Sequence, residues 1–176
     1  MSPAPVTLEV TLTGAPDAVD VAYTIANTSD APVWLLDTLL VRDGGAWQAA
    51  PARAIVSRGE PGQVRFILGY LRAGSQRPEI EQGVAVSMPP AAHRLGPGEH
   101  VDGGFQVPRP LTPWHPYLEM ARLRDPVRAV VEIGYLAGDE PRWDQQPAAP
   151  AGARVPDLPS VNAREQWASS AEQPLP

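Results

Sequence analysis

The chain has 176 residues and a formal net charge of −6 at pH 7, and it contains no cysteine. Without thiols it has no means of forming disulfides, thiolate nucleophiles or cysteine-ligated metal centres. All 14 basic residues are arginine, which excludes Schiff-base chemistry, an anchor for pyridoxal phosphate and the lysine of a P-loop. The acidic balance and the scattered arginines disfavour nucleic-acid binding.

The length predicts one main domain, and 22 prolines with 15 glycines favour short strands over long helices. The chain has no apolar stretch of transmembrane length and no signal-peptide pattern before its first strand-like segment. We therefore expect a cytoplasmic protein that does not enter a membrane and that carries no cofactor.

Alternation of apolar and polar residues predicts the first strands. Residues 6–12 and 19–25 place an apolar side chain at every second position, which is typical of strands with one buried face. Residues 33–41 are apolar on both faces except at Asp37, which indicates a central strand. The sequence RDGGAW that follows predicts a tight hairpin.

The second half of the chain repeats this strand pattern less regularly. Further strands are predicted over 64–70, 84–88, 101–107 and 127–135. Gly103 and Gly104 indicate a bulge or a close backbone approach. One short helix is predicted near 113–124, where Thr112 is a candidate cap and Asp125-Pro126 would end the helix.

Seven to nine strands separated by turn signals predict an all-β antiparallel sandwich over residues 1–140. The stretch VAYTIANTSDAPVWL resembles the second strand, polar turn and third strand of bacterial immunoglobulin-like (fibronectin III-like) domains. The stretch LGPGEHV resembles a turn that opens a later strand in the same domains. The resemblance implies a sandwich fold and leaves the activity open.

Residues 141–176 are rich in proline and alanine, which predicts an extended C-terminal tail without a core of its own. Spaced apolar residues along it, among them Trp143, Leu158 and Trp167, are interpreted as anchors that dock either on the sandwich or on a partner.

The loop 109–117 is the leading candidate site. Prolines stiffen it, and the residue types that it gathers are those that anchor protein interfaces, namely Arg109, Trp114, His115 and Tyr117. The competing interpretation is that its aromatic residues only fill one end of the sandwich. We expect a non-enzymatic interaction or structural protein that docks on a larger assembly or enzyme, or on itself, through this loop and the tail.

Two other classes of function stay open at this stage. His100 and Asp102 form a His-x-Asp pair that, with His115, suggests a small metal-binding protein or metalloenzyme. A zinc or copper site formed by His93, His100 and His115 is a further possibility. A carbohydrate-binding module would use an exposed indole of Trp34, Trp47 or Trp114. Glu79 and Glu81 are interpreted as a charged edge or loop rather than as a catalytic pair.

Overall fold

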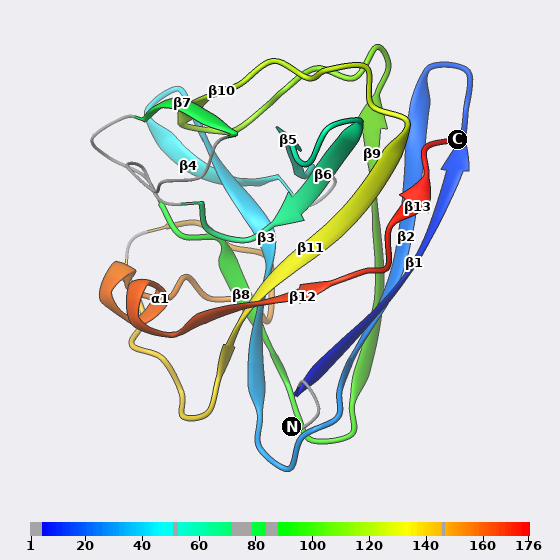
Figure 1. Cartoon of the computed structure of the whole chain (residues 1–176). Helices are drawn as coiled ribbons and strands as arrows, with labels where there is room; N and C mark the ends of the chain where they lie inside the picture. Colours follow the sequence, from blue (N-terminus) through cyan, green and yellow to red (C-terminus); the bar gives the residue numbers. More distant parts are fainter. Residues whose placement is uncertain (1–4, 51–52, 72–78, 84–87, 146) are drawn as a thin grey trace.

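The computed structural model describes residues 5–50, 53–71, 79–83, 88–145 and 147–176 (Figure 1). It is an all-β fold with a single helix among these residues. Most of the strand predicted over 84–88 lies outside the described residues. In the part of the chain that the structure describes, no helix is long and apolar enough to cross a membrane.

A three-stranded antiparallel sheet forms one layer of the sandwich. It contains β1 (Val6–Gly14), β2 (Ala18–Asn27) and β9 (His100–Pro108) in the order β1-β2-β9. The predicted alternation is confirmed, because Val19, Val21 and Ile25 are buried and the positions between them are more exposed. A side chain at Gly103 would collide with the Tyr23 phenol, so this glycine marks a close approach of the Tyr23 side chain to β9.

The second layer is a larger sheet around the long strands β3 (Val33–Asp43) and β11 (Arg128–Ala137). Its main path is β4-β3-β11-β6-β5, and β8, β12 and β13 pair with β3 or β11. The added strands are β4 (Ala46–Ala50), β5 (Ile55–Arg58), β6 (Gln63–Leu68), β8 (Ala91–Leu95), β12 (Glu165–Ser169) and β13 (Gln173–Pro174). The β6–β11 pairing is parallel, and the predicted β3–β4 hairpin forms with Gly44 and Gly45 at positive φ.

The core lies between the two layers and extends to the outer face of β3. Leu35 and Leu39 point between the sheets, whereas Trp34 and Leu36 point outward. That outer face is covered by the C-terminal segment, including Val161 of α1 (Leu158–Arg164), which is completely buried. The burial of both faces explains why β3 is apolar throughout.

The structure has no helix over residues 113–124, contrary to the prediction. Pro113 and Pro116 interrupt the start of that segment, and its apolar residues alternate instead in the strand β10 (Leu118–Met120), which pairs with β7 (Ile80–Gly83). The helix α1 forms later, in the segment predicted to be extended. Asp157 caps it by accepting a hydrogen bond from the Ser160 N–H at 2.8 Å.

Residues 141–176 dock on the chain's own sandwich, which was one of the two alternatives for the tail. β12 and β13 pair with β11, and the Gln173 side-chain amide donates to the Val10 carbonyl at 2.9 Å. Figure 1 shows this segment passing between β11 and β1. The C-terminal segment therefore bridges the two layers on one side of the sandwich.

The two stretches that carried the resemblance meet at the buried residue Asn27. Its side-chain amide donates to the carbonyls of Ala31 at 2.8 Å and of Leu95 and Gly96 at 3.1 Å each. Its backbone N–H donates to the Glu99 carbonyl at 3.0 Å. Both turns are thus fixed by one residue, and their role in this chain is structural.

Candidate functional site

The loop 109–117 is fixed to the rest of the fold by hydrogen bonds. The backbone N–H and carbonyl of Trp114 both pair with Val56 of β5 at 2.9 Å. The Tyr117 hydroxyl donates to the Leu40 carbonyl at 2.6 Å. The loop is therefore held against the edge of the larger sheet in a defined conformation.

His115 stabilises the turn within this loop. Its Nδ1 accepts hydrogen bonds from the backbone N–H groups of Tyr117 and Leu118, each at 3.0 Å. Burial lowers the pKa of His115 to about 3, so the imidazole is neutral at physiological pH. A neutral ring whose Nδ1 already accepts two bonds has a structural role.

Beside Trp114 the loop encloses a mainly apolar cavity of about 210 Å³, called here the Trp114 hollow. It lies between β5, the end of β9 and the loop. Its lining residues are Arg53, Ala54, Val56, Gln106, Val107, Pro108, Thr112, Pro113 and Trp114. The Arg53 guanidinium lies 4.1 Å from the indole centroid of Trp114, a cation–π contact that places a positive charge at the rim.

A second, more open hollow of about 600 Å³ lies at the other end of β9 and is called the His93 hollow. Its lining residues are Leu35, Asp37, His93, Arg94, Leu95, Glu99, His100 and Val101. His93 Nδ1 lies 2.7 Å from Asp37 Oδ1, and this hydrogen bond raises the pKa of His93. Asp37 is the acid that interrupts the apolar sequence of β3. The pKa of Tyr23 is raised by the burial of its phenol and, to a smaller extent, by the negative charge of Asp37.

The structure separates the tail anchors from the loop residues. Trp143 packs edge-on against Trp34 with ring centroids 5.1 Å apart, and the Trp167 ring would meet a side chain at Gly69. Leu158, the first residue of α1, is 39% exposed. Trp143 and Trp167 therefore already take part in packing within the chain, whereas Leu158 stays partly exposed.

Arg109 connects the loop to the end of the described C-terminal segment, because its guanidinium donates to the Pro176 carbonyl. Together with the Gln173 bond to β1, this contact ties the C-terminal segment to the three-stranded layer. Arg109 therefore supports the position of the loop from the side of the sandwich that the segment covers.

The candidate metal ligands are not assembled into one site. Asp102 points to the outer face of the three-stranded sheet, where it accepts a hydrogen bond from Thr24 Oγ1 at 2.6 Å. His100 is exposed beside the His93 hollow, and His115 is half-buried in its loop. Among the described residues, no group of three histidine, aspartate or glutamate side chains is placed to hold a metal ion.

The three indoles considered for carbohydrate binding are all packed against other side chains. Trp34 is 9% exposed and contacts Trp143. Trp47 lies edge-on to Tyr117 with 5.7 Å between centroids, and Trp114 carries Arg53 over its ring. Neither Trp47 nor Trp114 belongs to the exposed residues, so no ring of the three is an open stacking platform.

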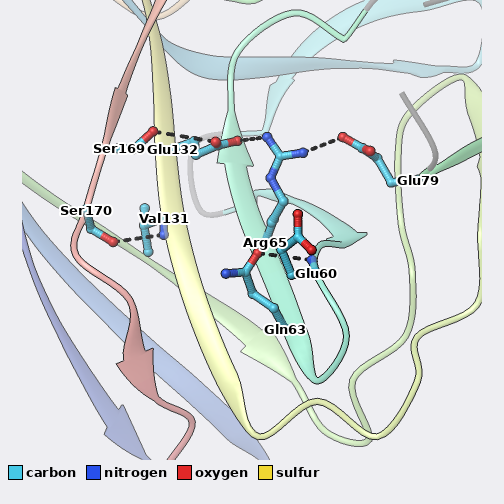
Figure 2. Close-up of polar contacts among 8 residues, drawn as sticks. All are labelled: Glu60, Gln63, Arg65, Glu79, Val131, Glu132, Ser169 and Ser170. Atoms are coloured by element: carbon cyan, nitrogen blue, oxygen red, sulfur yellow. Dashed lines mark hydrogen bonds and ion pairs between the residues drawn. The ribbon is translucent and has the colours of Figure 1, made fainter. Parts of the chain in front are cut away.

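A partly buried ion network links the larger sheet to Glu79 beside β7, away from both hollows. Figure 2 shows Arg65 of β6 between Glu79 and Glu132, with its guanidinium donating to both carboxylates. Ser169 of β12 lies 3.5 Å from Glu132 and links the network to the C-terminal segment. Because Glu79 is paired with an arginine, it has a structural partner rather than the second carboxylate that glycoside hydrolysis needs.

Sequence reasoning missed the residues that complete the two hollows. Arg53 and Val56 lie far from Trp114 in the sequence, and only the pairing of the loop with β5 brings them together. Asp37 was noticeable as an isolated acid in an apolar strand, but nothing in the sequence connects it to His93.

No family model matches this chain, and neither the curated proteins nor the solved structures contain a match.

Proposed function

We propose that this protein is a non-enzymatic binding module that docks on another protein, with the Trp114 hollow receiving an apolar side chain of the partner. One observation carries the proposal: the hollow is formed by a loop that is already fixed by backbone bonds between Trp114 and Val56. A preformed site avoids part of the entropic cost of ordering a loop on binding.

The size of the hollow favours a protein partner over a small molecule. Pockets for drug-sized ligands have volumes of about 300–1,000 Å³. The Trp114 hollow has about 210 Å³ and suits one or two side chains. Arg53 at its rim favours an acidic residue next to the inserted apolar one, because the guanidinium is exposed on the side away from the ring.

The role proposed for the C-terminal segment is support of this site. Trp143 and Trp167 pack within the chain, and Arg109 joins the segment to the loop. We therefore assign partner binding to the loop 109–117 and its hollow, and not to the tail anchors. We further propose an immunoglobulin-like sandwich, since the chain crosses from one layer to the other at the turn between β2 and β3.

The test fills the hollow without unfolding the loop. Thr112 lines the hollow and is exposed, so Thr112→Trp is expected to cover it, whereas Thr112→Val loses the same hydroxyl and leaves it open. The full-length wild type and both variants are immobilised, and proteins retained from an extract of the natural host are quantified by mass spectrometry. We expect a specific protein retained by the wild type and by Thr112→Val but not by Thr112→Trp. Identical retention by all three proteins would contradict the proposal.

A further inference from the structure

We propose that the free edge of β9 binds an extended peptide segment of the partner as an added strand, whose inward-facing side chains enter the Trp114 hollow and the His93 hollow. This inference rests on the proposed function and specifies the conformation and side-chain spacing of the bound segment. It follows from the direction of the β9 backbone groups and from the positions of the two hollows.

The register of β2 and β9 shows which backbone groups are free. The Asn27 N–H donates to the Glu99 carbonyl at 3.0 Å, and the Arg109 N–H donates to the Asp17 carbonyl at 2.7 Å. In an antiparallel pair, hydrogen-bonded residues alternate with residues whose groups point away from the partner strand. The odd-numbered residues from 99 to 109 therefore face β2, and the even-numbered residues direct their N–H and carbonyl groups to the other side.

Four consecutive even-numbered residues offer both a donor and an acceptor on this side: His100, Asp102, Gly104 and Gln106. All four are exposed, and no hydrogen bond between described residues ends on their backbone groups. Pro108 follows them without an N–H and ends the available ladder. The free edge is thus long enough to pair with a segment of about seven residues.

Several other strand edges of this fold receive contacts from elsewhere in the chain. Gln173 bonds to β1 at Val10, and Trp114 pairs with β5. Arg154 exchanges two backbone bonds with Ala92 of β8, and β12 and β13 pair with β11. Natural sheets cover or block their edges because an open edge is a template for another strand. Among the described strands, β9 pairs only with β2, as β4 pairs only with β3, and of these two open edges only that of β9 has a hollow at each end.

The two hollows lie at the two ends of this free edge. Val101 lines the His93 hollow and Val107 lines the Trp114 hollow. These residues are six positions apart, which is about 20 Å along a strand. A strand that pairs with β9 places side chains opposite Val101 and Val107 on the inner side of the sheet, so it presents one apolar side chain to each hollow at positions i and i+6.

The hollows favour a separate peptide segment over β9 of a second copy. In β9 the inward-facing residues Phe105 and Val107 are only 5% and 3% exposed because they belong to the core of their own sandwich. The same residues of a second copy are not free to enter the hollows. An extended segment outside a folded core has side chains free for both.

The experiment uses the full-length protein and a phage-displayed library of random dodecapeptides. Peptides selected on the wild type are synthesised, and their dissociation constants are measured for two variants. Gln106→Pro removes one free-edge N–H, whereas Gln106→Ala keeps it, and both lose the hydrogen bond from Gln106 to Asp20. We expect selected peptides with apolar residues six positions apart, at least tenfold weaker binding by Gln106→Pro, and less than twofold change for Gln106→Ala.

Amide hydrogen exchange of the wild type gives a second measurement that does not depend on the variants folding. In the free protein the amides of Gly103, Phe105 and Val107 should be protected and those of Asp102, Gly104 and Gln106 should exchange fast. The selected peptide should protect the second set.

Failure of the inference is distinguishable from failure of the proposed function. Peptides whose binding is abolished by Thr112→Trp but is equal for Gln106→Pro and Gln106→Ala would overturn the added strand and leave the hollow as the docking site. Absence of any enriched peptide would overturn the added strand. Protection of the free-edge amides in the isolated protein, together with a dimeric mass, would also overturn it, because it would identify a second copy as the occupant of the edge.

Discussion

The Arg65 network allows a quantitative test of what holds the larger sheet to the segment that covers it. Arg65 pairs with Glu79 and with Glu132, and the three side chains are 16%, 2% and 14% exposed, respectively. Arg65→Met keeps most of the side-chain volume and removes the positive charge. The buried carboxylate of Glu79 and the partly buried carboxylate of Glu132 would then lose their counter-charge.

The expected cost is large because the penalty comes from the charges that remain. Removing one partner of a buried ion pair destabilises proteins by about 3–5 kcal/mol. A domain of this size has a total stability of about 5–15 kcal/mol, so about a fifth or more of it would be lost. The matched control is Arg128→Met, because the ion pair of Arg128 with Glu172 is exposed, at 43% and 37%, and should contribute about 1 kcal/mol or less.

Urea denaturation at pH 7 and 25 °C, followed by tryptophan fluorescence, measures these free energies of unfolding. The double variant Arg65→Met/Glu79→Gln should recover at least about 1 kcal/mol relative to Arg65→Met, because it neutralises the most buried carboxylate. If Arg65→Met cost no more than Arg128→Met, the reasoning from burial would be refuted.

Three further predictions concern pH and the C-terminal segment. The pKa of His115 is about 3 in the folded state, so below about pH 6.5 the unfolded chain takes up a proton that the folded chain does not. The free energy of unfolding should therefore fall by up to about 2 kcal/mol between pH 6.5 and pH 5. An equal fall in the variant His115→Asn would contradict this prediction. The hydrogen bond to Asp37 raises the pKa of His93 in the folded protein. The protonated His93 therefore stabilises the fold below about pH 6.5, and this stabilisation is lost as the pH rises through the pKa of His93 in the folded state. His93→Gln should therefore cost up to about 1 kcal/mol at pH 6 and nothing at pH 9 in the same assay, and equal costs would refute the linkage. In the variant Gly69→Ala the new Cβ would lie 2.5 Å from the Trp167 ring, so β12 should detach from β11. Trypsin should then cleave the variant faster than the wild type after Arg164. Unchanged cleavage would show that the Trp167 ring has room to move.

The strands with one solvent-exposed face were predictable because the alternation of apolar and polar residues along each strand is a local pattern. Residues 6–12, 19–25 and 127–135 alternate in polarity, and the structure confirms strands at Val6–Gly14, Ala18–Asn27 and Arg128–Ala137. Val127 was predicted to be the first inward-facing residue of the last strand, but it lies before that strand and is 64% exposed. The parallel pairing of β6 with β11 was not predictable, since both strands have similar apolar patterns and nothing local selects the partner.

The predicted position of the helix was wrong for an identifiable reason. The segment 113–124 has apolar residues at spacings that suit either a helix or a strand, and its prolines and its pairing with β7 decide for the strand β10. In α1 the signal was present but short: Asp157 as a cap, followed by a proline in the first turn. Seven residues are too few for a periodic pattern to stand out in a proline-rich segment.

The candidate site was half predictable. The composition of the loop 109–117 indicated a rigid aromatic surface, and Trp114 does form one wall of a hollow. The opposite wall, from Arg53 to Val56, depends on a tertiary contact with no counterpart in the local sequence. The unpaired edge of β9 was hidden for the same reason, because a strand pattern does not reveal whether both of its sides have partners.

Because β12 and β13, which cover one edge of β11, come from the last part of the chain, synthesis on the ribosome delays completion of the larger sheet. Residues 141–176 take about 2–7 s to translate, and during that time β11 and β9 both present open edges. The β11 edge closes when β12 and β13 arrive, whereas nothing in the described chain closes β9. A cell that makes this protein therefore faces a brief aggregation hazard at one edge and a lasting one at the other, unless a partner is produced alongside it.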